Sequence, residues 1–195
     1  MAKSKICLLN KMGREELIFN KEDSVDPGGY FIINGAERVI VAIEDLASNR
    51  ILVEADERKE SCIAKVFSTR HGFRSLGIVE RKRDGLLRVS FPGVPGALPF
   101  VNVMKALGLE KDLSIVNAVS GDEIIQKELL DNLEEGMDII TQEDALDVIG
   151  KRVAIGQLKE YRLKRAQVTI DKFLLPHIGI EAEDRIRKAY YLGIM

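Results

Sequence analysis

The sequence contains few of the residues that mark a disulfide-stabilised, disordered or membrane-spanning chain. Its two cysteines, Cys7 and Cys62, lie far apart and form no C-x-x-C pair, which argues against a disulfide scaffold and a zinc ribbon and favours a reducing compartment. Five prolines in 195 residues indicate that most of the chain folds. No apolar run approaches the roughly 20 residues of a membrane span, and no secretory leader follows the first lysines. We therefore expect a cytoplasmic protein with no membrane partner.

Motifs of common enzyme families are also missing. The sequence has no G-x-G-x-x-G, P-loop, G-x-S-x-G or H-E-x-x-H pattern. Its two histidines, His71 and His177, have no Cys, Asp or Glu at ligand spacing. We expect His177, at the end of an apolar helix, to pack or cap. For His71, in the predicted loop "STRHGFRS", solvent exposure and phosphate contact are both open.

The first half of the chain has the pattern of β structure. Hydrophobic residues make up 46% and charged residues 31%, which is typical of a globular protein. Residues 30–33 and 39–43 are predicted as short strands that flank Asn34-Gly35, the first of them buried. Further strands are predicted at 51–53 and 62–67, and a hairpin reverses at Asp84-Gly85.

The second half has the pattern of helices. Prolines and glycines in residues 91–100 predict a crossing loop, followed by a helix from Pro99 to near Gly108. Ser120 with Glu123, and Thr141 with Asp144, have the spacing of capping boxes, and Gly150 is predicted to end the second of these helices. Two more helices are predicted, one ended by Pro176 and one from residue 181 onward. The prediction is an α+β fold, with helices packed on or beside a mostly antiparallel sheet.

A net charge of −2 hides an uneven distribution. Residues 110–147 are acidic, whereas residues 65–88 and 151–172 are basic. An arginine-rich hairpin can lie along nucleic-acid backbone, although a solvated, aggregation-resistant hairpin tip has the same composition. The candidate nucleic-acid contacts are Arg70, His71, Arg74, Arg81, Lys82, Arg83 and Arg88. A basic helix face is the candidate partner surface, with Lys159, Arg162 and Arg165, and a solvated face is its alternative.

One acidic cluster could suggest a metal site. Glu143, Asp144 and Asp147 lie in the first turns of a predicted helix. The helix dipole explains carboxylates at this position without a metal, and a metal would need further oxygen ligands from other loops. We therefore predict no metal ligand and no catalytic residue in this chain.

Five stretches, in order, resemble the second-largest subunit of multisubunit DNA-directed RNA polymerases in its archaeal and eukaryotic form. "DPGGYFIINGAERVIV" at 26–41 is similar to the G-G-Y-F-I-I-N-G-x-E-[KR] motif of that family. The other stretches are "KSKIC", "LPFVNVMKALG", "EGMDIITQEDALDVIGKR" and "FLLPHIGI" with "RKAYYLGIM". The sequence departs from the family in lacking the Cys-Pro that often precedes the first motif, and "STRHGFRSLGIVERKRDG" has no residue-by-residue match.

The resemblance implies a structural role in transcription. It implies that residues 46–175 form the lobe domain, that residues 1–45 belong to the protrusion side, and that residues 176–195 form a helix leading back to it. These parts line the downstream-DNA cleft in the family, and the form that we expect is the split archaeal one, B double-prime. The implied partners are double-stranded DNA, other polymerase subunits and transcription factors. The magnesium and zinc of the parent enzyme would lie outside this chain, so no cofactor is expected within it.

Two other functions fit the residues. A free-standing, magnesium-dependent phosphoryl or nucleotidyl transferase could use Glu143, Asp144 and Asp147. A pure protein-interaction module could use the basic helix without DNA. Because both ends of the sequence interrupt a pattern, we expect an excised piece of a longer protein.

Overall fold

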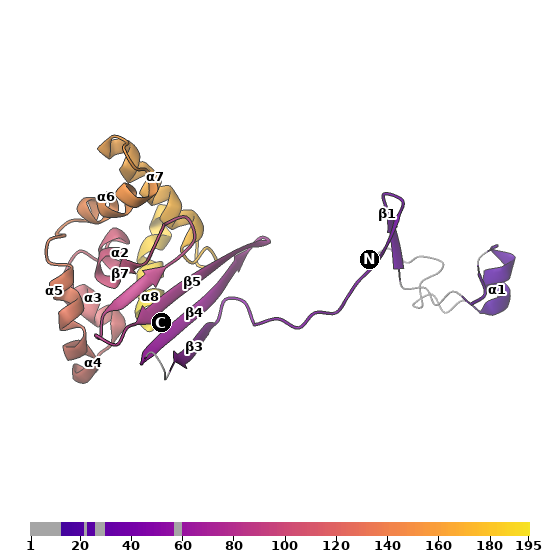
Figure 1. Ribbon diagram of the computed structural model, residues 1–195, viewed down its shortest axis with the longest axis horizontal. Helices are drawn as coiled ribbons and strands as arrows, with labels where there is room; N and C mark the ends of the chain where they lie inside the picture. The colour runs from indigo at the N-terminus through magenta and orange to yellow at the C-terminus, as the bar shows by residue number, and fades with distance from the viewer. Residues whose placement is uncertain (1–12, 22, 26–29, 57–59) are drawn as a thin grey trace. The chain divides into compact units, whose positions relative to one another are not determined.

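The computed structural model describes residues 13–21, 23–25, 30–56 and 60–195 (Figure 1). Contacts divide the chain into two units, Met1–Asp45 and Leu46–Met195. The predicted turn and close backbone approach at residues 26–29 lie outside the described residues. Apart from one short helix near the start, antiparallel strands come first and helices second, so the predicted α+β class is confirmed.

The first unit contains a short helix and a two-stranded hairpin. The helix is α1 (Arg14–Phe19), and the hairpin pairs β1 (Tyr30–Ile33) with β2 (Ala36–Val39). Asn34 and Gly35 have φ angles of 51° and 77°. Such left-handed values suit a two-residue hairpin turn, so the predicted reversal is confirmed.

Two other predictions for this hairpin were wrong. The second strand ends at Val39, and residues 40–43 are in no strand. The first strand is not buried, because Ile32 and Ile33 are 67% and 56% exposed. Two strands alone have no second layer to cover them, so an apolar sequence does not by itself produce burial.

An antiparallel sheet of five strands organises the second unit. Neighbouring strands in the sheet are also consecutive in the chain. The strands are β3 (Ile51–Asp56), β4 (Ser61–Arg70), β5 (Phe73–Arg81), β6 (Leu87–Ser90) and β7 (Leu98–Pro99). The predicted reversal at Asp84-Gly85 is confirmed, with Gly85 at φ 81° and an Asp84 carboxylate oxygen that accepts from the Leu86 N–H at 3.1 Å.

The predicted loop at residues 68–75 was wrong. Most of it is strand, and only His71 and Gly72 turn the chain, with φ angles of 47° and 79°. A His-Gly pair can adopt the left-handed turn that Asn-Gly adopts more often, so the tight hairpin was missed.

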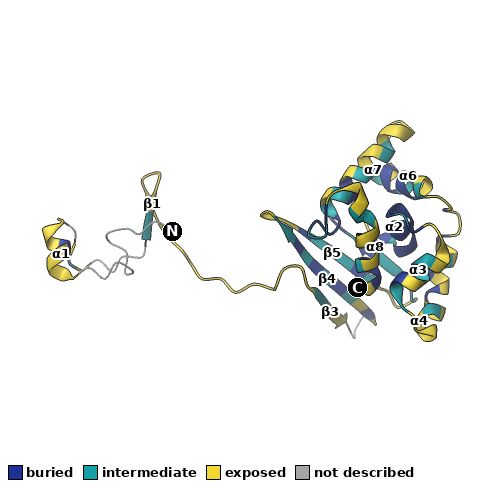
Figure 2. Cartoon of the chain, turned by 180° about the vertical axis from the view of Figure 1, so that it is seen from behind, coloured by how far each residue is buried: buried dark blue, intermediate teal, exposed yellow. Residues whose placement is uncertain are grey.

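One face of the sheet is covered by helices, as the view in Figure 2 shows. On that face Val66, Val79 and Val89 are 0% to 6% exposed. Every residue of α2 is buried beneath the other helices. The helices are α2 (Phe100–Ala106), α3 (Asp112–Val119), α4 (Glu123–Glu128), α5 (Leu130–Glu135), α6 (Gln142–Val153), α7 (Lys159–Phe173) and α8 (Arg185–Ile194), with a 3-10 turn at Ala182–Asp184. Within the described ranges, no helix has the length and apolar character needed to cross a membrane.

The helix starts show which capping predictions were correct. At α6 the Thr141 hydroxyl accepts from the Asp144 N–H at 3.2 Å, so that capping box is confirmed. The start predicted from Ser120 was wrong, because the N-cap of α4 is Asp122, whose carboxylate accepts from the Ile124 N–H at 2.8 Å. Ser120 instead follows α3, where its hydroxyl accepts from the Asp122 N–H. Ser120 and Asp122 are both good N-cap residues, and in the structure Asp122 is the one that caps α4.

Gly150 does not end α6, contrary to the prediction. The helix continues to Val153, and Gly150 lies where α6 crosses α7. A Cβ atom at this position would lie 2.7 Å from the Arg162 carbonyl oxygen. The glycine therefore permits a close approach of two helices, a role that sequence spacing does not distinguish from a C-cap.

A buried cluster of charges joins α7 to α8. The Arg185 guanidinium donates to both carboxylate oxygens of Asp171, at 2.8 and 2.6 Å. Lys188 is 0% exposed, and its ammonium donates to the carbonyl oxygens of Ile170 and Asp171 at 3.2 and 2.9 Å. Lys188 thus gives a partner to the Asp171 carbonyl in the last turn of α7 and a second donor to the Ile170 carbonyl, which also accepts from the Leu174 N–H at 3.0 Å.

Lys188 gives the stability of the chain a predictable pH dependence. Burial lowers the pKa of Lys188 from 10.5 to about 8. Between these two values the unfolded chain binds the proton and the folded chain releases it, so stability rises with pH. The two carbonyl acceptors favour the charged form, so we expect a gain of about 1 to 2 kcal/mol across this window. The measurement is urea unfolding of the native chain and of Lys188→Met at pH 7.5 and pH 10. The quantity compared is the difference between their free energies of unfolding at each pH. If this difference did not change with pH, the prediction would be wrong.

Candidate nucleic-acid interface

The structure separates the seven candidate nucleic-acid residues into two groups. They lie at opposite ends of β5, a strand of nine residues. At about 3.3 Å per residue, the two ends are roughly 25 Å apart. Arg70, His71 and Arg74 lie at the β4–β5 turn, whereas the other four lie at or near the β5–β6 turn.

Acidic side chains neutralise most of the β5–β6 end. Three arginines there form ion pairs at 2.7 to 2.9 Å: Arg81 with Glu128, Arg83 with Glu60, and Arg88 with Glu135. Two of the carboxylates come from α4 and α5, which belong to the acidic stretch noted in the sequence. Lys82 has no hydrogen-bonded or ionic side-chain partner among the described residues. A phosphate that contacted Arg81, Arg83 or Arg88 would therefore have to displace a carboxylate, whereas one that contacted Lys82 would not.

The β4–β5 end is different, and we call it the basic turn: Arg70, His71, Arg74 and Lys172. Lys172 comes from the end of α7, and the adjacent Phe173 ring lies 5.8 Å from the Phe73 ring. In the described part of the chain, no carboxylate pairs with Arg70, His71 or Lys172. The Arg74 guanidinium lies 4.4 Å from the centre of the Phe67 ring. Lys172 lies 5.3 Å from the centre of the Phe173 ring, and cations beside aromatic rings are a combination that nucleic-acid surfaces use.

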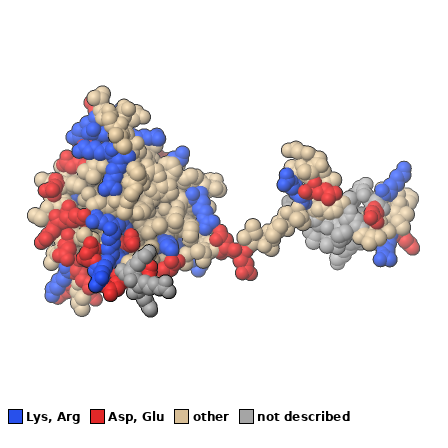
Figure 3. Space-filling model, viewed as in Figure 1, with Lys and Arg blue, Asp and Glu red and all other residues tan. Residues whose placement is uncertain are grey.

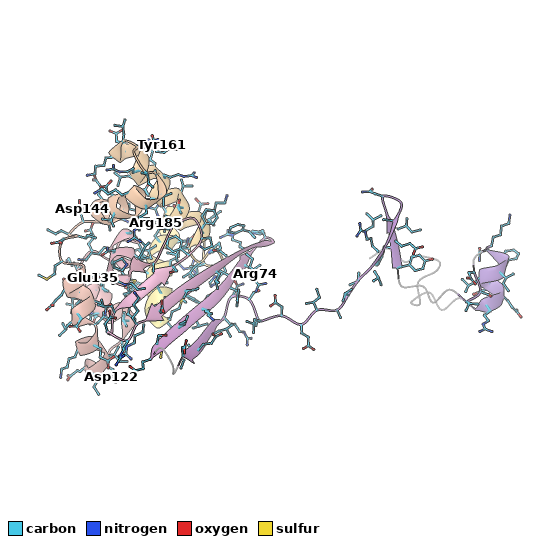
Figure 4. All side chains as sticks on the ribbon, in the orientation of Figure 1. Arg74, Asp122, Glu135, Asp144, Tyr161 and Arg185 are labelled. Atoms are coloured by element: carbon cyan, nitrogen blue, oxygen red, sulfur yellow. The ribbon has the colours of Figure 1, made fainter. Side chains whose placement is uncertain are left out.

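The pictures agree with this separation of charge. Figure 4 shows Arg74 by the β4–β5 turn, apart from the labelled Asp122 and Glu135 of the helical side. In Figure 3 the acidic atoms of the second unit gather over the α4 and α5 side. The acidic helices therefore neutralise one end of the sheet and leave the other end basic.

A packed polar cluster supports the basic turn from the helix side. The Ser68 hydroxyl lies 2.8 Å from the ring atom Nδ1 of His177. The backbone N–H of His177 donates to the same hydroxyl at 3.0 Å. The His177 ring also contacts the edge of Tyr191, with ring centres 5.1 Å apart. Burial, with the nearby Lys188 charge, lowers the pKa of His177, which favours the neutral ring. The predicted packing role of His177 is confirmed.

The three residues of the predicted partner surface, Lys159, Arg162 and Arg165, do not form a common exposed face. Arg162 turns toward α6 and contacts an Asp147 carboxylate oxygen at 2.9 and 2.8 Å. Lys159 pairs with Glu143 at 2.8 Å. Arg165 is exposed and has no ionic partner in the part of the chain that the structure describes. Of Lys159, Arg162 and Arg165, the predicted partner surface, only Arg165 has no carboxylate partner among the described residues.

The three carboxylates of the alternative magnesium site also have protein partners. Hydrogen bonds from Thr141 lower the pKa of Asp144. Burial raises the pKa of Asp147, but hydrogen bonds from Lys151 and Arg162 outweigh it and leave the pKa below its usual value. Glu143 bonds to Lys159. Among the described residues, no group of three or more His, Cys, Asp or Glu side chains has a metal-binding arrangement.

Sequence reasoning missed Lys172 and the two phenylalanines at the basic turn. Phe73 and Phe173 are separated by 100 positions, so no local spacing indicates that they meet. Lys172 lies in the basic stretch of residues 151–172, but nothing in that stretch indicates that it folds beside the β4–β5 turn.

Comparisons with known proteins agree with the resemblance noted in the sequence. The family described as "RNA polymerase Rpb2, domain 2" matches residues 47–195. DNA-directed RNA polymerase subunit Rpo2N of Halobacterium salinarum is 54% identical over 98% of this chain and 38% of its own length. Rpo2N of Methanococcus vannielii is 52% identical over 100% of this chain and 40% of its own. Subunit Rpo2 of Saccharolobus solfataricus is 50% identical over 99% of this chain and 17% of its own.

The chain spans about two fifths of the length of the Rpo2N relatives and less of Rpo2. Identity of 50% to 54% runs across both units, and the family match covers nearly all of the second unit. The chain therefore belongs to the Rpb2 family of archaeal-type, second-largest subunits of DNA-directed RNA polymerase, and contains its domain 2.

Proposed function

We propose that this chain is a structural part of a DNA-directed RNA polymerase, in which it forms part of the wall of the downstream-DNA cleft. Residues 46–175 would form the lobe, and residues 1–45 and 176–195 would belong to the protrusion side. The names of the relatives support membership in a nucleotidyltransferase complex. We assign no catalytic residue to this chain, and propose that catalysis and its metal ions reside in other parts of the enzyme.

We further propose that the basic turn contacts the backbone of duplex DNA without reading its sequence. The observation that carries this proposal is that Arg70 and Lys172 have no carboxylate partner among the described residues. Cations already paired with carboxylates gain little from phosphate, whereas unpaired cations release counterions from DNA. Of the seven candidates, Arg70 is therefore favoured over Arg81, Arg83 and Arg88. Contacts to other polymerase subunits and to transcription factors are part of the same proposal.

The salt dependence of binding tests the DNA contact. The 195-residue chain is titrated against a fluorescent duplex by anisotropy, at several salt concentrations. We expect weak binding that falls steeply with salt. Because each phosphate contact contributes a slope of about −0.9 to log K against log salt, Arg70→Gln with Lys172→Gln should reduce the slope by about 2.

A matched control uses the other end of the sheet. Arg81→Gln with Arg83→Gln removes the same formal charge, but from ion pairs with Glu128 and Glu60. We expect this double variant to keep the native slope. Equal losses in the two double variants, or native binding that does not change with salt, would exclude the basic turn as the DNA contact. Measurable magnesium-dependent phosphoryl transfer by the chain would instead favour the alternative enzyme.

A further inference from the structure

Helix α7 carries a regular row of exposed side chains along one side. Leu158, its N-cap residue, is 82% exposed, and Tyr161 and Val168 are 54% and 53% exposed. Arg165, between Tyr161 and Val168 in the chain, is also exposed. The four residues follow one another at spacings of three, four and three, which places them on the same side of a helix. We call these four residues the outer row, and Figure 4 shows its Tyr161 near the start of α7.

The other sides of α7 already have partners within the second unit. Ala166, Thr169 and Ile170 are 0% to 3% exposed, and α7 packs against α6. Exposed apolar residues need no explanation when they are scattered singly. A row at helical spacing is different, because its members, spread over about 15 Å, can contact one partner at the same time.

The unpaired charges of α7 are mostly positive. Its ion pairs with neighbouring helices use Lys159, Arg162 and Asp171. Four other α7 charges have no ionic side-chain partner among the described residues: Glu160, Lys164, Arg165 and Lys172. Glu160 is four residues before Lys164, so it lies beside that cation rather than beside Arg165. In Figure 3 the blue atoms of lysine and arginine gather over the α6 and α7 end of the second unit.

The mixture of apolar and cationic side chains favours a protein partner over nucleic acid. A phosphate backbone would attract Arg165, but it offers no apolar surface to Leu158 and Val168. Tyrosine and arginine, by contrast, are enriched among the residues that dominate the binding energy of protein interfaces. The outer row contains one of each, with an apolar residue at either end.

An amphipathic helix matches the outer row in length and spacing. Two helices that pack side by side contact each other through residues three and four apart, which is the spacing of the row. The positive charge of α7 then favours a partner helix with carboxylates beside its apolar side chains. A second copy of α7 would instead bring three further unpaired cations and one carboxylate, so like charges oppose self-association.

We propose that the outer row of α7 binds an acidic amphipathic helix of a partner protein. Its apolar side chains pack against Leu158, Tyr161 and Val168, and its carboxylates pair with Arg165. The inference gives a site and a chemistry to the protein contacts of the proposed function, on which it rests. It does not depend on DNA contact by the basic turn.

The test uses the 195-residue chain and a synthetic helical peptide. The peptide has about 18 residues, because shorter isolated helices are marginal in water. Leucines at spacings of three and four form one side of it, and glutamates flank them. One control peptide has the same residues with the leucines distributed around the helix, and a second has lysine in place of glutamate. By fluorescence anisotropy, we expect the glutamate peptide to bind about tenfold more tightly than either control.

Variants of the outer row locate the binding site. Tyr161→Ala should weaken binding of the glutamate peptide about tenfold or more. Its matched control is Tyr190→Ala on α8, at a 50% exposed tyrosine, which should leave binding unchanged. Arg165→Glu should shift the preference from the glutamate to the lysine peptide, whereas Lys127→Glu, an equal change of charge on α4, should not. Thermal melting checks that each variant folds.

A parallel duplex titration separates this proposal from the DNA contact. Tyr161→Ala should keep the native salt slope of duplex binding. Arg70→Gln with Lys172→Gln should reduce that slope and keep the preference for the glutamate peptide. Absence of peptide binding with native duplex binding would overturn the outer row alone. If Tyr161→Ala weakened duplex binding and not peptide binding, the outer row would be a nucleic-acid surface, and the proposal would be wrong.

Three further results would overturn the proposal. The first is equal binding of the three peptides, and the second is binding that survives both Tyr161→Ala and Arg165→Glu. The third is a Tyr161 ring that is shielded from solvent in the chain without peptide, as photo-CIDNP NMR measures. If that shielding grows with protein concentration, a second copy covers the row, and if it does not, the chain itself does.

Discussion

Replacing Gly150 by alanine should destabilise the second unit by about 2 to 4 kcal/mol. In a solvent-exposed helix the same change would stabilise the protein by about 1 kcal/mol, because alanine is the better helix former. Here a Cβ would lie 2.7 Å from the Arg162 carbonyl oxygen and 2.8 Å from the Arg162 Cβ. One contact is to backbone, so α6 and α7 would have to separate. The steric cost therefore exceeds the gain in helix propensity.

Urea unfolding followed by circular dichroism measures this effect. Gly121→Ala is the matched control, because a Cβ at Gly121 would meet nothing within 4 Å. We expect that control to stay within about 0.5 kcal/mol of the native chain. A stabilised Gly150→Ala variant would show that propensity outweighs packing at this crossing, contrary to our expectation.

Replacing Asp171 by leucine should destabilise the chain by about 3 to 5 kcal/mol. The carboxylate accepts two hydrogen bonds from Arg185, and both side chains are largely buried, at 17% and 14% exposed. The buried Lys188 lies nearby, and the negative charge of Asp171 opposes the fall in its pKa. Without Asp171, two cations would remain in a poorly hydrated site after losing the carboxylate that bonds to Arg185, and only the more distant charges of Glu183 and Asp184 would oppose them. Figure 4 shows Arg185 within the helical side of the second unit.

Two companion variants separate lost pairing from lost packing. Asp171→Leu combined with Arg185→Leu removes the stranded guanidinium and should recover part of the loss. Glu143→Gln breaks the Lys159 pair, whose side chains are 53% and 60% exposed, and should cost about 0 to 0.5 kcal/mol. Urea midpoints and slopes measure all three. A loss below about 1 kcal/mol for Asp171→Leu would mean that water or another group compensates the buried cations.

Local signals in the sequence predicted most of the elements. The turns at Asn34-Gly35 and Asp84-Gly85, the Thr141 capping box and the alternation along β4 depend on residues within a few positions of one another. The errors arose where one residue type serves two purposes. Gly150 can end a helix or admit a neighbouring helix, and His71-Gly72 can be part of a loop or a complete hairpin turn. Local composition does not distinguish these alternatives.

The candidate interface was predicted less well than the fold. Sequence reasoning found the basic residues but not which of them already have partners. Arg81 and Glu128 are 47 positions apart, and so are Arg88 and Glu135. No short-range pattern could show that α4 and α5 fold over one end of the sheet. The acidic and basic stretches therefore looked separate, although many of their members pair.

The sequence by itself determined the family, the α+β class and most turns and caps, because family motifs and local conformational preferences are encoded in contiguous residues. Tertiary structure alone decided which arginines pair with distant carboxylates and where Gly150 is required. Both depend on distances between residues far apart in the chain, and on whether a charge meets a partner before it meets solvent.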